Sequence, residues 1–369
     1  MTIGIVFHPY GEAKPGGLAR TIFEWTSALL SNDAGNQYII FLKNNLNNAP
    51  KLPGHPKIVP LGGGKLWLDK LKEFPELDLC IFQTPVLPPI YKPKRSIIIV
   101  QDFPYKHLKA QSLKERLRNN FLFRYHKRSL GRADAVIAVS EATKNDLIKF
   151  FKVPPEKITV IYMGYKNICA EPEAYLDLPE KFFFYAGVIK ERKNVLNIVK
   201  AFAIFTHSTA LRIGSDEPKK NLDYKLVLAG KDDGDYAQTV KEFVRASDLN
   251  AEVIFLGYLN DYQLSRVYKK AAAFIFPSLV EGFGFPVLEA MACGLPVITA
   301  NFGGPAEIGA NGAAILVDPL SPERLAEAMT RIVTDPNYRH QLIAAGLARS
   351  QEFSWNKTAE KTLELIKNI

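Results

Sequence analysis

The chain has 369 residues, of which 47% are hydrophobic and 23% charged, enough apolar material for two buried cores and too much for a disordered chain. Its 24 glycines and 24 prolines exclude a collagen-like or low-complexity protein. The 47 Lys and Arg residues outnumber the 38 Asp and Glu residues and give a net charge of +9, which favours an anionic partner.

The first half of the chain alternates short β-branched runs with amphipathic stretches. The runs that predict strands are 3–7, 38–42, 78–82, 96–100, 134–139 and 158–162. The stretches that predict helices between them are 18–30, 112–130 and 141–151. Strands that are apolar throughout and separated by helices indicate a parallel sheet that is covered on both faces.

The second half repeats this series, with strands predicted at 182–186, 225–229, 253–256, 272–276, 296–299 and 313–317. Two series predict an α/β protein with two doubly wound, Rossmann-like domains, and more than eight strands argue against a single barrel. The break is an acidic stretch at 169–181, which contains Pro172 and Pro179 and has no periodicity. We expect ligands to bind in a cleft at the carboxyl ends of both sheets.

The cysteines and the hydropathy indicate a cytoplasmic protein. Cys80, Cys169 and Cys293 are far apart and match neither a zinc spacing nor a disulfide framework, so we predict three reduced, buried thiols. No apolar run approaches the ~20 residues of a membrane-spanning helix. The stretch at 1–8 has no basic leader and predicts a first buried strand rather than a signal peptide.

Two glycine-containing loops follow predicted strands and are candidate phosphate sites. Gly16 and Gly17 lie between the first strand and the first helix, where backbone N–H groups can approach a phosphate, although a plain turn explains a lone pair of glycines as well. Gly187 begins a loop after the first strand of the second domain, and that loop contains Arg192 and Lys193. These two cations would neutralise a diphosphate, although solvated surface charge is the alternative.

The most informative stretch is 277–297, where the predicted strand 272–276 leads into a glycine loop and then a helix with Pro286 in its first turn. The loop amides and the helix dipole together predict an anion site. Glu281 in the loop and Glu289, expected on the first turn of the helix, are acidic, so they suit sugar hydroxyls rather than phosphate. The loop residues between them are Gly282, Phe283, Gly284 and Phe285.

The spacing of Glu281 and Glu289 within Glu-Gly-Phe-Gly-Phe-Pro-Val-Leu-Glu-Ala-Met-Ala-Cys-Gly-Leu-Pro-Val resembles the signature of family 4 retaining glycosyltransferases, also called group 1 glycosyltransferases. The stretch 187–194 is similar to the Arg-Lys-Asn phosphate loop of that family. The stretches 139–148, 154–158, 313–319 and 353–355 match other family patterns in order and spacing. The resemblance covers nearly the whole chain and is clearer in its second half.

The resemblance implies the GT-B fold, with an acceptor-side domain at 1–170, a donor-binding domain at 171–352 and a helix at 353–369 that returns to the first domain. It implies that Arg192 and Lys193 bind the diphosphate of a nucleotide-sugar donor. It also implies that Glu281 and the backbone of 282–285 contact the transferred sugar and that Glu289 contacts the ribose. No metal and no cofactor are expected, because the two cations take the place of a divalent ion.

The chain departs from the family at one position of the first domain. Many members have His-Asp after a strand where this chain has Gln101 and Asp102, and the His contacts the donor sugar. Gln101 can hydrogen-bond a sugar hydroxyl but cannot accept a proton, so no catalytic histidine is assigned. His107 or His8 remains open as a substitute. The usual Pro-Asn-Gly near the end of that domain is Tyr162-Met163-Gly164 here, which affects a local turn.

The positive charge is concentrated at 105–132, which contains nine Lys and Arg residues and one acidic residue. The rest of the chain therefore carries a net charge of about +1. Leucines and aromatic residues are interleaved with these cations. A basic helix with exposed apolar side chains suits an anionic membrane surface, and a helix whose apolar side chains are core is the alternative. A surface contact would fit a lipid-linked carbohydrate acceptor and a peripheral location at the cytoplasmic face of the membrane.

The leading hypothesis is a retaining, metal-independent glycosyltransferase of hexosyl type in cell-envelope polysaccharide or glycolipid synthesis. A sugar phosphorylase or a nucleotide-sugar epimerase on the same fold is the second hypothesis. A nucleic-acid-binding protein is the third, and it is disfavoured because the second half of the chain is not basic and contains no binding module.

Overall fold

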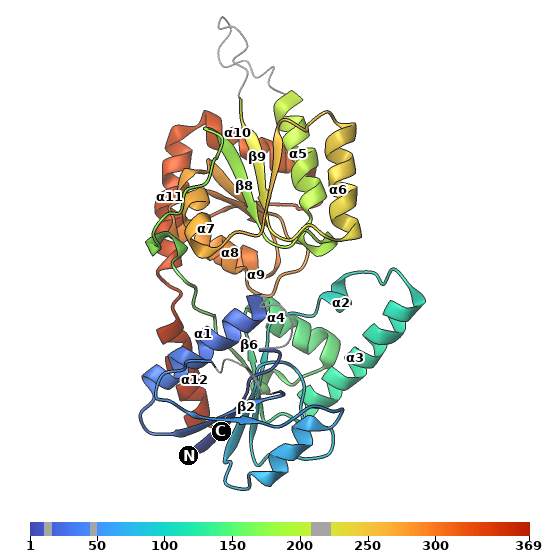
Figure 1. Ribbon diagram of the computed structural model, residues 1–369, viewed down its shortest axis with the longest axis vertical. Helices are drawn as coiled ribbons and strands as arrows, with labels where there is room; N and C mark the ends of the chain where they lie inside the picture. The colour runs from blue at the N-terminus through green and yellow to red at the C-terminus, as the bar shows by residue number, and fades with distance from the viewer. Residues whose placement is uncertain (11–16, 45–49, 208–222) are drawn as a thin grey trace, which may run out of the picture. The chain divides into compact units, whose positions relative to one another are not determined.

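The computed structural model describes residues 1–10, 17–44, 50–207 and 223–369. It divides the chain into two compact units (Figure 1). The first unit comprises Met1–Gly164 together with Phe353–Ile369, and the second comprises Tyr165–Glu352. The division therefore lies a few residues before the predicted boundary at 170.

The first unit contains a seven-stranded parallel sheet in the order β3-β2-β1-β4-β5-β6-β7. Its strands are β1 (Thr2–Val6), β2 (Gln37–Leu42), β3 (Lys57–Pro60), β4 (Leu79–Phe82), β5 (Ser96–Val100), β6 (Ala135–Ala138) and β7 (Ile158–Val160). The order reverses between β1 and β4, which is the mark of a doubly wound sheet. The edge strand β3 was not predicted, because it is short, only half-buried and ends at Pro60.

The helices of the first unit are α1 (Gly17–Asn32), α2 (Pro104–His107), α3 (Leu113–Arg132), α4 (Glu141–Asp146) and α12 (Trp355–Lys367). A π-helical turn at Leu147–Phe151 continues α4, and 3₁₀ turns lie at Trp67–Glu73 and Pro155–Lys157. Serine side chains cap three of the helices by accepting a backbone N–H of the first turn, at Ser112, Ser140 and Ser354.

The C-terminal helix α12 is part of the first unit and packs on α1. The Thr358 hydroxyl of α12 donates a hydrogen bond of 2.9 Å to the Tyr162 carbonyl. Gly164 lies directly against this helix, since a Cβ there would come within 2.6 Å of the Trp355 Cα and closer still to its backbone nitrogen. The glycine of the Tyr162-Met163-Gly164 turn is therefore required by a close backbone approach.

The second unit contains a six-stranded parallel sheet in the order β10-β9-β8-β11-β12-β13. Its strands are β8 (Phe182–Ala186), β9 (Lys225–Ala229), β10 (Val253–Gly257), β11 (Ala273–Phe276), β12 (Val297–Ala300) and β13 (Ile315–Val317). Four consecutive β8 residues, 182–185, have no exposed surface, which requires cover on both faces of the sheet. Two doubly wound parallel sheets confirm the predicted fold class and rule out the barrel.

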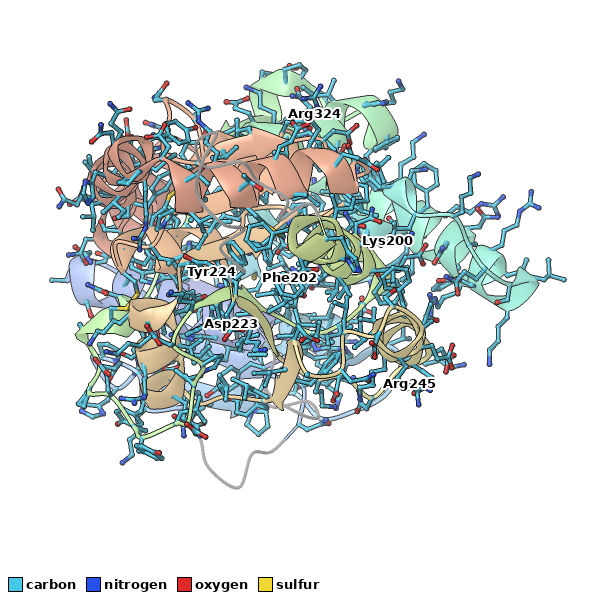
Figure 2. All side chains as sticks on the ribbon, turned by 90° about the horizontal axis from the view of Figure 1, so that it is seen from above. Lys200, Phe202, Asp223, Tyr224, Arg245 and Arg324 are labelled. Carbon is cyan, nitrogen blue, oxygen red and sulfur yellow. A yellow bond between two sulfur atoms is a disulfide. The ribbon has the colours of Figure 1, made fainter. Side chains whose placement is uncertain are left out.

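Among the described residues of this unit, seven helices surround the sheet: α5 (Val195–His207), α6 (Asp235–Ala246), α7 (Asp261–Lys270), α8 (Phe285–Ala292), α9 (Gly303–Ile308), α10 (Pro322–Thr334) and α11 (Pro336–Ser350). Figure 2 shows Phe202 of α5 directed into the core, whereas Arg245 of α6 and Arg324 of α10 lie on the outside. The amphipathic pattern that predicted helices in the gaps between strands thus places apolar side chains on the sheet.

The prediction of three reduced thiols is wrong for two of the cysteines. Cys169, in the 3₁₀ turn Ile168–Ala170, forms a disulfide with Cys293, with their Cα atoms 5.4 Å apart. The two cysteines are 124 residues apart in the sequence, so their spacing does not indicate a disulfide. They meet because this turn packs on α8. Cys80 is a buried free thiol, and burial raises its pKa to about 12.

Within the parts of the chain that the structure describes, every helix is too short or too polar to traverse a lipid bilayer.

Candidate functional site

The candidate site is built from loops at the carboxyl ends of β8 and β11, which are neighbouring strands of the second sheet. The Arg192 carbonyl accepts hydrogen bonds from the Leu279 backbone N–H at 2.8 Å and from the Ser278 hydroxyl at 2.9 Å. Asn194, in the left-handed conformation at φ 60°, donates to the carbonyls of Pro277 at 3.2 Å and Pro319 at 2.6 Å. The bonds to residues 277–279 hold the two loops together, and the bond to Pro319 attaches them to the loop after β13.

Arg192, Lys193 and Glu281 form one charge cluster, which we call the cation pair with its carboxylate. The Lys193 ammonium makes a short ion pair with Glu281 Oε2, and Arg192 Nη1 lies 3.1 Å from the same oxygen. Arg192 Nη1 also donates to the Val280 carbonyl at 3.2 Å, and Lys193 Nζ lies 4.6 Å from the centre of the Phe276 ring. The structure therefore brings together the two cations that the resemblance assigns to the diphosphate and the carboxylate that it assigns to the transferred sugar.

Burial and charge act in opposite directions on the pKa of Glu281. The largest effect, desolvation by burial, raises the pKa, but the adjacent Lys193 ammonium and Arg192 guanidinium lower it below its usual value. Lys193 is only 8% exposed. With Glu281 ionised and both cations charged, the cluster carries a net charge of +1, which suits an incoming anion.

The glycine loop next to this cluster is largely buried and leads into α8. Gly282 and Phe283 are buried, and the rings of Phe283 and Phe285 pack edge to face at 5.2 Å. Gly284 caps α8 at φ 112°, a left-handed conformation that favours glycine. Pro286 lies in the first turn of the helix, which confirms the prediction for that residue.

Glu289 lies one turn further along α8 than the sequence analysis placed it. The helix begins at Phe285, so Glu289 is in its second turn, and the expectation of a first-turn carboxylate is wrong. The Tyr268 hydroxyl of α7 donates to Glu289 Oε2 at 3.4 Å, and Glu289 is half-buried. A carboxylate in the second turn gains little from the helix dipole, which favours a role in accepting hydrogen bonds.

Two close backbone approaches shape the site. Gly187 has φ 149°, and its N–H donates to the Ala229 carbonyl at 2.9 Å. A Cβ on Gly230, which follows Ala229, would lie 2.5 Å from the Gly187 carbonyl carbon. A Cβ on Gly304, in the first turn of α9, would lie 2.6 Å from the Phe283 Cα and even closer to the Gly282 oxygen. Neither position has room for any other residue.

Sequence reasoning missed Gly230, Gly304, Tyr268 and the anchoring role of Asn194. The Gly303-Gly304 pair after an apolar strand was an available signal of the kind that drew attention to Gly16 and Gly17. For Tyr268 the sequence offers no signal, because its contact with Glu289 depends on how α7 packs beside α8.

The candidate residues of the first unit come from two parts of that unit, the end of β1 and the stretch from β5 through α2. His8 follows β1, is half-buried, and its ring centre lies 5.3 Å from that of Trp67. Gln101 and Asp102 follow β5 and are half-buried, and the Gln101 carbonyl accepts a 2.8 Å hydrogen bond from the Thr143 hydroxyl. His107 pairs with Asp146 at 2.6 Å.

The predicted glycine pair of the first unit is only partly described. Gly17 is exposed at the start of α1, and a Cβ there would meet no atom within 4 Å, so packing does not require glycine. Gly16 lies outside the described residues.

The basic segment 105–132 is largely an exposed helix. Of the residues of α3, only Ser129 and Leu130 are buried. Leu113, Leu117 and Phe121 are 72%, 62% and 68% exposed, and their spacing of four residues places them on one face. The apolar side chains of this face are therefore not part of the core.

Two parallel-sheet units with this loop architecture define the GT-B fold class. A model described as Glycosyltransferase Family 4 matches residues 15–166, and one described as Glycosyl transferases group 1 matches residues 171–349. The chain belongs to the family 4, or group 1, glycosyltransferases.

Curated relatives include O-antigen chain mannosyltransferase B of Escherichia coli, 27% identical over 252 residues that span 65% of this chain and 62% of the relative. The serotype-specific mannosyltransferase WbdA of the same organism is 28% identical over 246 residues, 63% of this chain and 28% of the relative. The match thus spans less than two thirds of either relative.

Solved structures with the same fold include sucrose-phosphate synthase from Thermosynechococcus elongatus, with a TM-score of 0.77, 23% identity and coverage of 100% and 98% of the two chains. Anabaena HepE in complex with UDP-glucose has a TM-score of 0.74 at 19% identity, with 100% of both chains covered. WaaG, a glycosyltransferase involved in lipopolysaccharide biosynthesis, has a TM-score of 0.71 at 18% identity, with 99% of both chains covered. At these identities the likeness concerns the fold.

Proposed function

We propose that the protein is a retaining glycosyltransferase that moves a hexose-type sugar from a nucleotide-sugar donor to a hydroxyl acceptor, in cell-envelope polysaccharide or glycolipid synthesis. The observation that carries the proposal is the cation pair of Arg192 and Lys193 held on Glu281 beside the glycine loop. The relatives named as O-antigen and serotype-specific mannosyltransferases, and HepE with UDP-glucose, support it.

The chemistry follows from where charge develops. When the bond between the sugar C1 and the diphosphate oxygen breaks, negative charge collects on the leaving diphosphate. The Arg192 guanidinium and the Lys193 ammonium stabilise that charge in a partly buried site, where such interactions are strong. The two cations do the work of a divalent ion, so no metal is needed.

Glu281 has two roles in this scheme. Before the donor binds, its carboxylate keeps Lys193 charged and in place, since burial of an unpaired ammonium is costly. Once the diphosphate attracts the cations, the Glu281 oxygens accept hydrogen bonds from hydroxyls of the transferred sugar. Glu289 accepts from the ribose hydroxyls, and the backbone N–H groups of 282–285 contact the sugar.

Retention follows when the acceptor attacks from the face that the diphosphate leaves, with a diphosphate oxygen taking the acceptor proton. Gln101 fits this scheme, because it hydrogen-bonds hydroxyls without accepting a proton. Asp102 and His8 are further candidates for sugar or acceptor contact, and Gly17 and Gly187 are candidates for donor contact.

A ligand panel tests the donor side. Thermal unfolding is measured with UDP, GDP, ADP and their glucose and mannose derivatives, each at about 100 times its dissociation constant. A bound donor stabilises by roughly 2.7 kcal/mol and raises Tm by about 5 °C or more. A panel without any shift contradicts the proposal. Release of sugar 1-phosphate that depends on phosphate would instead indicate a phosphorylase, and conversion of the donor without acceptor an epimerase.

We further propose that α3 docks on an anionic membrane surface that presents a lipid-linked acceptor. The exposed face of Leu113, Leu117 and Phe121 is flanked by exposed cations that include Lys114, Arg124 and Lys127. Apolar side chains enter the headgroup boundary while cations attract anionic lipids, at ~1 kcal/mol per cation near the surface.

Vesicle co-sedimentation tests this surface. The triple variant Lys114→Gln, Arg124→Gln, Lys127→Gln is expected to bind vesicles with 30% phosphatidylglycerol about 100-fold more weakly than wild type, at ~1 kcal/mol per lost cation. Neutralising the exposed lysines Lys57, Lys361 and Lys367 of the same unit is the matched control and is expected to change little. Equal binding to anionic and to uncharged phosphatidylcholine vesicles rules the electrostatic contact out.

A further inference from the structure

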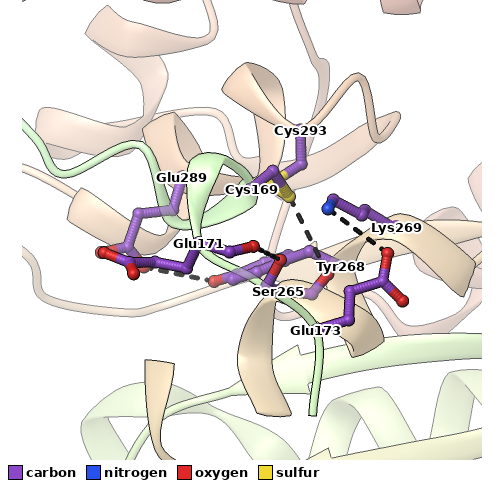
Figure 3. The surroundings of a disulfide bond; sticks show 8 residues. All are labelled: Cys169, Glu171, Glu173, Ser265, Tyr268, Lys269, Glu289 and Cys293. Atoms are coloured by element: carbon purple, nitrogen blue, oxygen red, sulfur yellow. Dashed lines mark hydrogen bonds and ion pairs between the residues drawn. A yellow bond between two sulfur atoms is a disulfide. The ribbon is translucent and has the colours of Figure 1, made fainter. Parts of the chain in front are cut away.

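The disulfide between Cys169 and Cys293 joins two parts of the second unit that lie next to the candidate site (Figure 3). Cys169 is in the segment 165–176, which begins the second unit. Cys293 is the C-terminal cap of α8, the helix that starts in the glycine loop and carries Glu289. Glu289 and Cys293 are four residues apart and therefore lie on the same face of this helix.

The segment 165–176 is fastened to α7 independently of the disulfide. Lys166 forms ion pairs with Asp261 at 2.8 Å and with Glu171 at 2.6 Å. The Ser265 hydroxyl donates to the Glu171 carbonyl at 3.0 Å. Further along, Lys269 pairs with Glu173 at 3.3 Å (Figure 3). The segment therefore stays on α7 when the sulfur–sulfur bond is broken.

Helix α7 also contacts Glu289, through the Tyr268 hydroxyl at 3.4 Å. The segment 165–176, α7 and α8 thus form a closed ring of contacts that includes the Glu289 carboxylate. The disulfide is the covalent link between the segment and the end of α8. The hydrogen bond from Tyr268 is long for an O–H donor, so the disulfide is a firmer connection to α8 than this hydrogen bond. Opening it removes the covalent hold on the C-terminal end of α8, which otherwise packs on α11, β11 and β12.

We propose that Cys169 and Cys293 form a reversible thiol–disulfide site that sets the affinity for the nucleoside part of the donor. This inference rests on the proposed function, because it takes Glu289 as the residue that receives the ribose. Neither cysteine residue is fully buried, and we expect a small dithiol to reach the pair. Arg192 and Lys193 are on the loop after β8, and Glu281 lies before the N-terminal end of α8, at the opposite end of the helix from Cys293.

The chemical step is a thiol–disulfide exchange with a small dithiol. One thiolate of the dithiol attacks a sulfur of the pair, the protein sulfur–sulfur bond breaks, and a mixed disulfide forms. The second thiol of the reagent then displaces the protein sulfur and closes the reagent's own disulfide. The protein gains two electrons and two protons and ends with two thiols.

The oxidised protein, with its preordered Glu289, binds nucleoside diphosphates more tightly, because less ordering remains to be done on binding. Reduction is expected to weaken the binding of the responsive nucleoside diphosphate by about fivefold or more, the lower end of typical coupling between sites. Inorganic pyrophosphate has no ribose and depends on Arg192 and Lys193, so its affinity is expected to change less than twofold.

Calorimetric titration of the full chain tests these expected affinities. The ligands are UDP, GDP, ADP and pyrophosphate, and each is titrated before and after treatment with dithiothreitol. Alkylation of the unfolded protein verifies whether the disulfide is intact. The oxidised form is expected to have one reactive thiol, Cys80, and the reduced form three. The Cys80→Ser variant is expected to keep the response, and Cys293→Ser is expected to bind like the reduced wild type with or without reductant.

Three results overturn the inference alone. The first is equal nucleotide affinity in the two verified states, and the second is three reactive thiols before any reductant is added. The third is an equal loss for nucleotide and pyrophosphate, which means general loosening of the unit. Absence of nucleotide and pyrophosphate binding in both states overturns the proposed function as well, and this distinguishes the two failures.

Discussion

Replacing Lys193 with alanine is expected to lower kcat/KM for sugar transfer by about 10²- to 10³-fold, the cost of removing one group that stabilises charge in a transition state. Lys193 is 8% exposed and lies against Glu281 and the Phe276 ring, so bulk water screens its charge little. Arg192→Ala is expected to have a loss of the same order, because both cations act on the same leaving group.

The two variants are expected to differ in folding stability, although both lose activity. A comparison of the two therefore separates the loss of catalysis from the loss of stability. Lys193→Ala leaves the buried Glu281 carboxylate with Arg192 alone, and breaking a buried pair typically costs about 3–5 kcal/mol. The Arg192 side chain is 31% exposed, so Arg192→Ala leaves the Lys193–Glu281 pair in place. The measurement is release of nucleoside diphosphate from the donor that the ligand panel selects, together with Tm.

Lys190→Ala is the matched control, since Lys190 is an exposed cation of the same loop. It is expected to retain more than half of the wild-type kcat/KM. Full activity in both the Arg192 and Lys193 variants refutes the assigned role of the cation pair.

Gly304→Ala is expected to lower kcat/KM by roughly 10²-fold without unfolding the second unit. The added methyl group meets the Phe283 Cα at 2.6 Å and the Gly282 oxygen closer still, and backbone atoms cannot rotate away as a flexible side chain does. The 281–284 loop must shift instead, and displacing a site by about 1 Å can cost 10²-fold in rate. Overpacking of this kind destabilises by about 1–3 kcal/mol.

The control for this change is Gly234→Ala. Gly234 caps α6 at φ −114° with no atom within 4 Å of an added Cβ, so alanine fits there, at the cost of at most part of the capping preference. Its activity is expected to match wild type. Wild-type activity of Gly304→Ala shows that the geometry of the 281–284 loop does not matter for transfer.

Those residues of the candidate site that lie close together in the sequence could be predicted from it. Arg192 and Lys193 are adjacent, and the residues from Glu281 to Glu289 form one continuous motif, so their types and spacing indicated an anion site beside hydroxyl acceptors. That the two stretches meet at one carboxylate depends on the pairing of β8 with β11, which no local pattern shows. Glu289 was expected in the first turn of α8, but the helix begins at Phe285, one residue before Pro286, and Glu289 falls in its second turn.

The sequence by itself determined the two doubly wound parallel sheets, the glycine loop before α8 and the concentration of charge on one helix. Apolar runs, glycines, prolines and charges act on their near neighbours in the chain, and such effects can be read locally. Only the tertiary structure decided the Cys169–Cys293 disulfide, the close approach of Gly304 to Phe283 and the exposure of Leu113, Leu117 and Phe121. These features depend on which surfaces pack together. Packing brings together residues that are far apart in the sequence, and no local pattern indicates that they will meet.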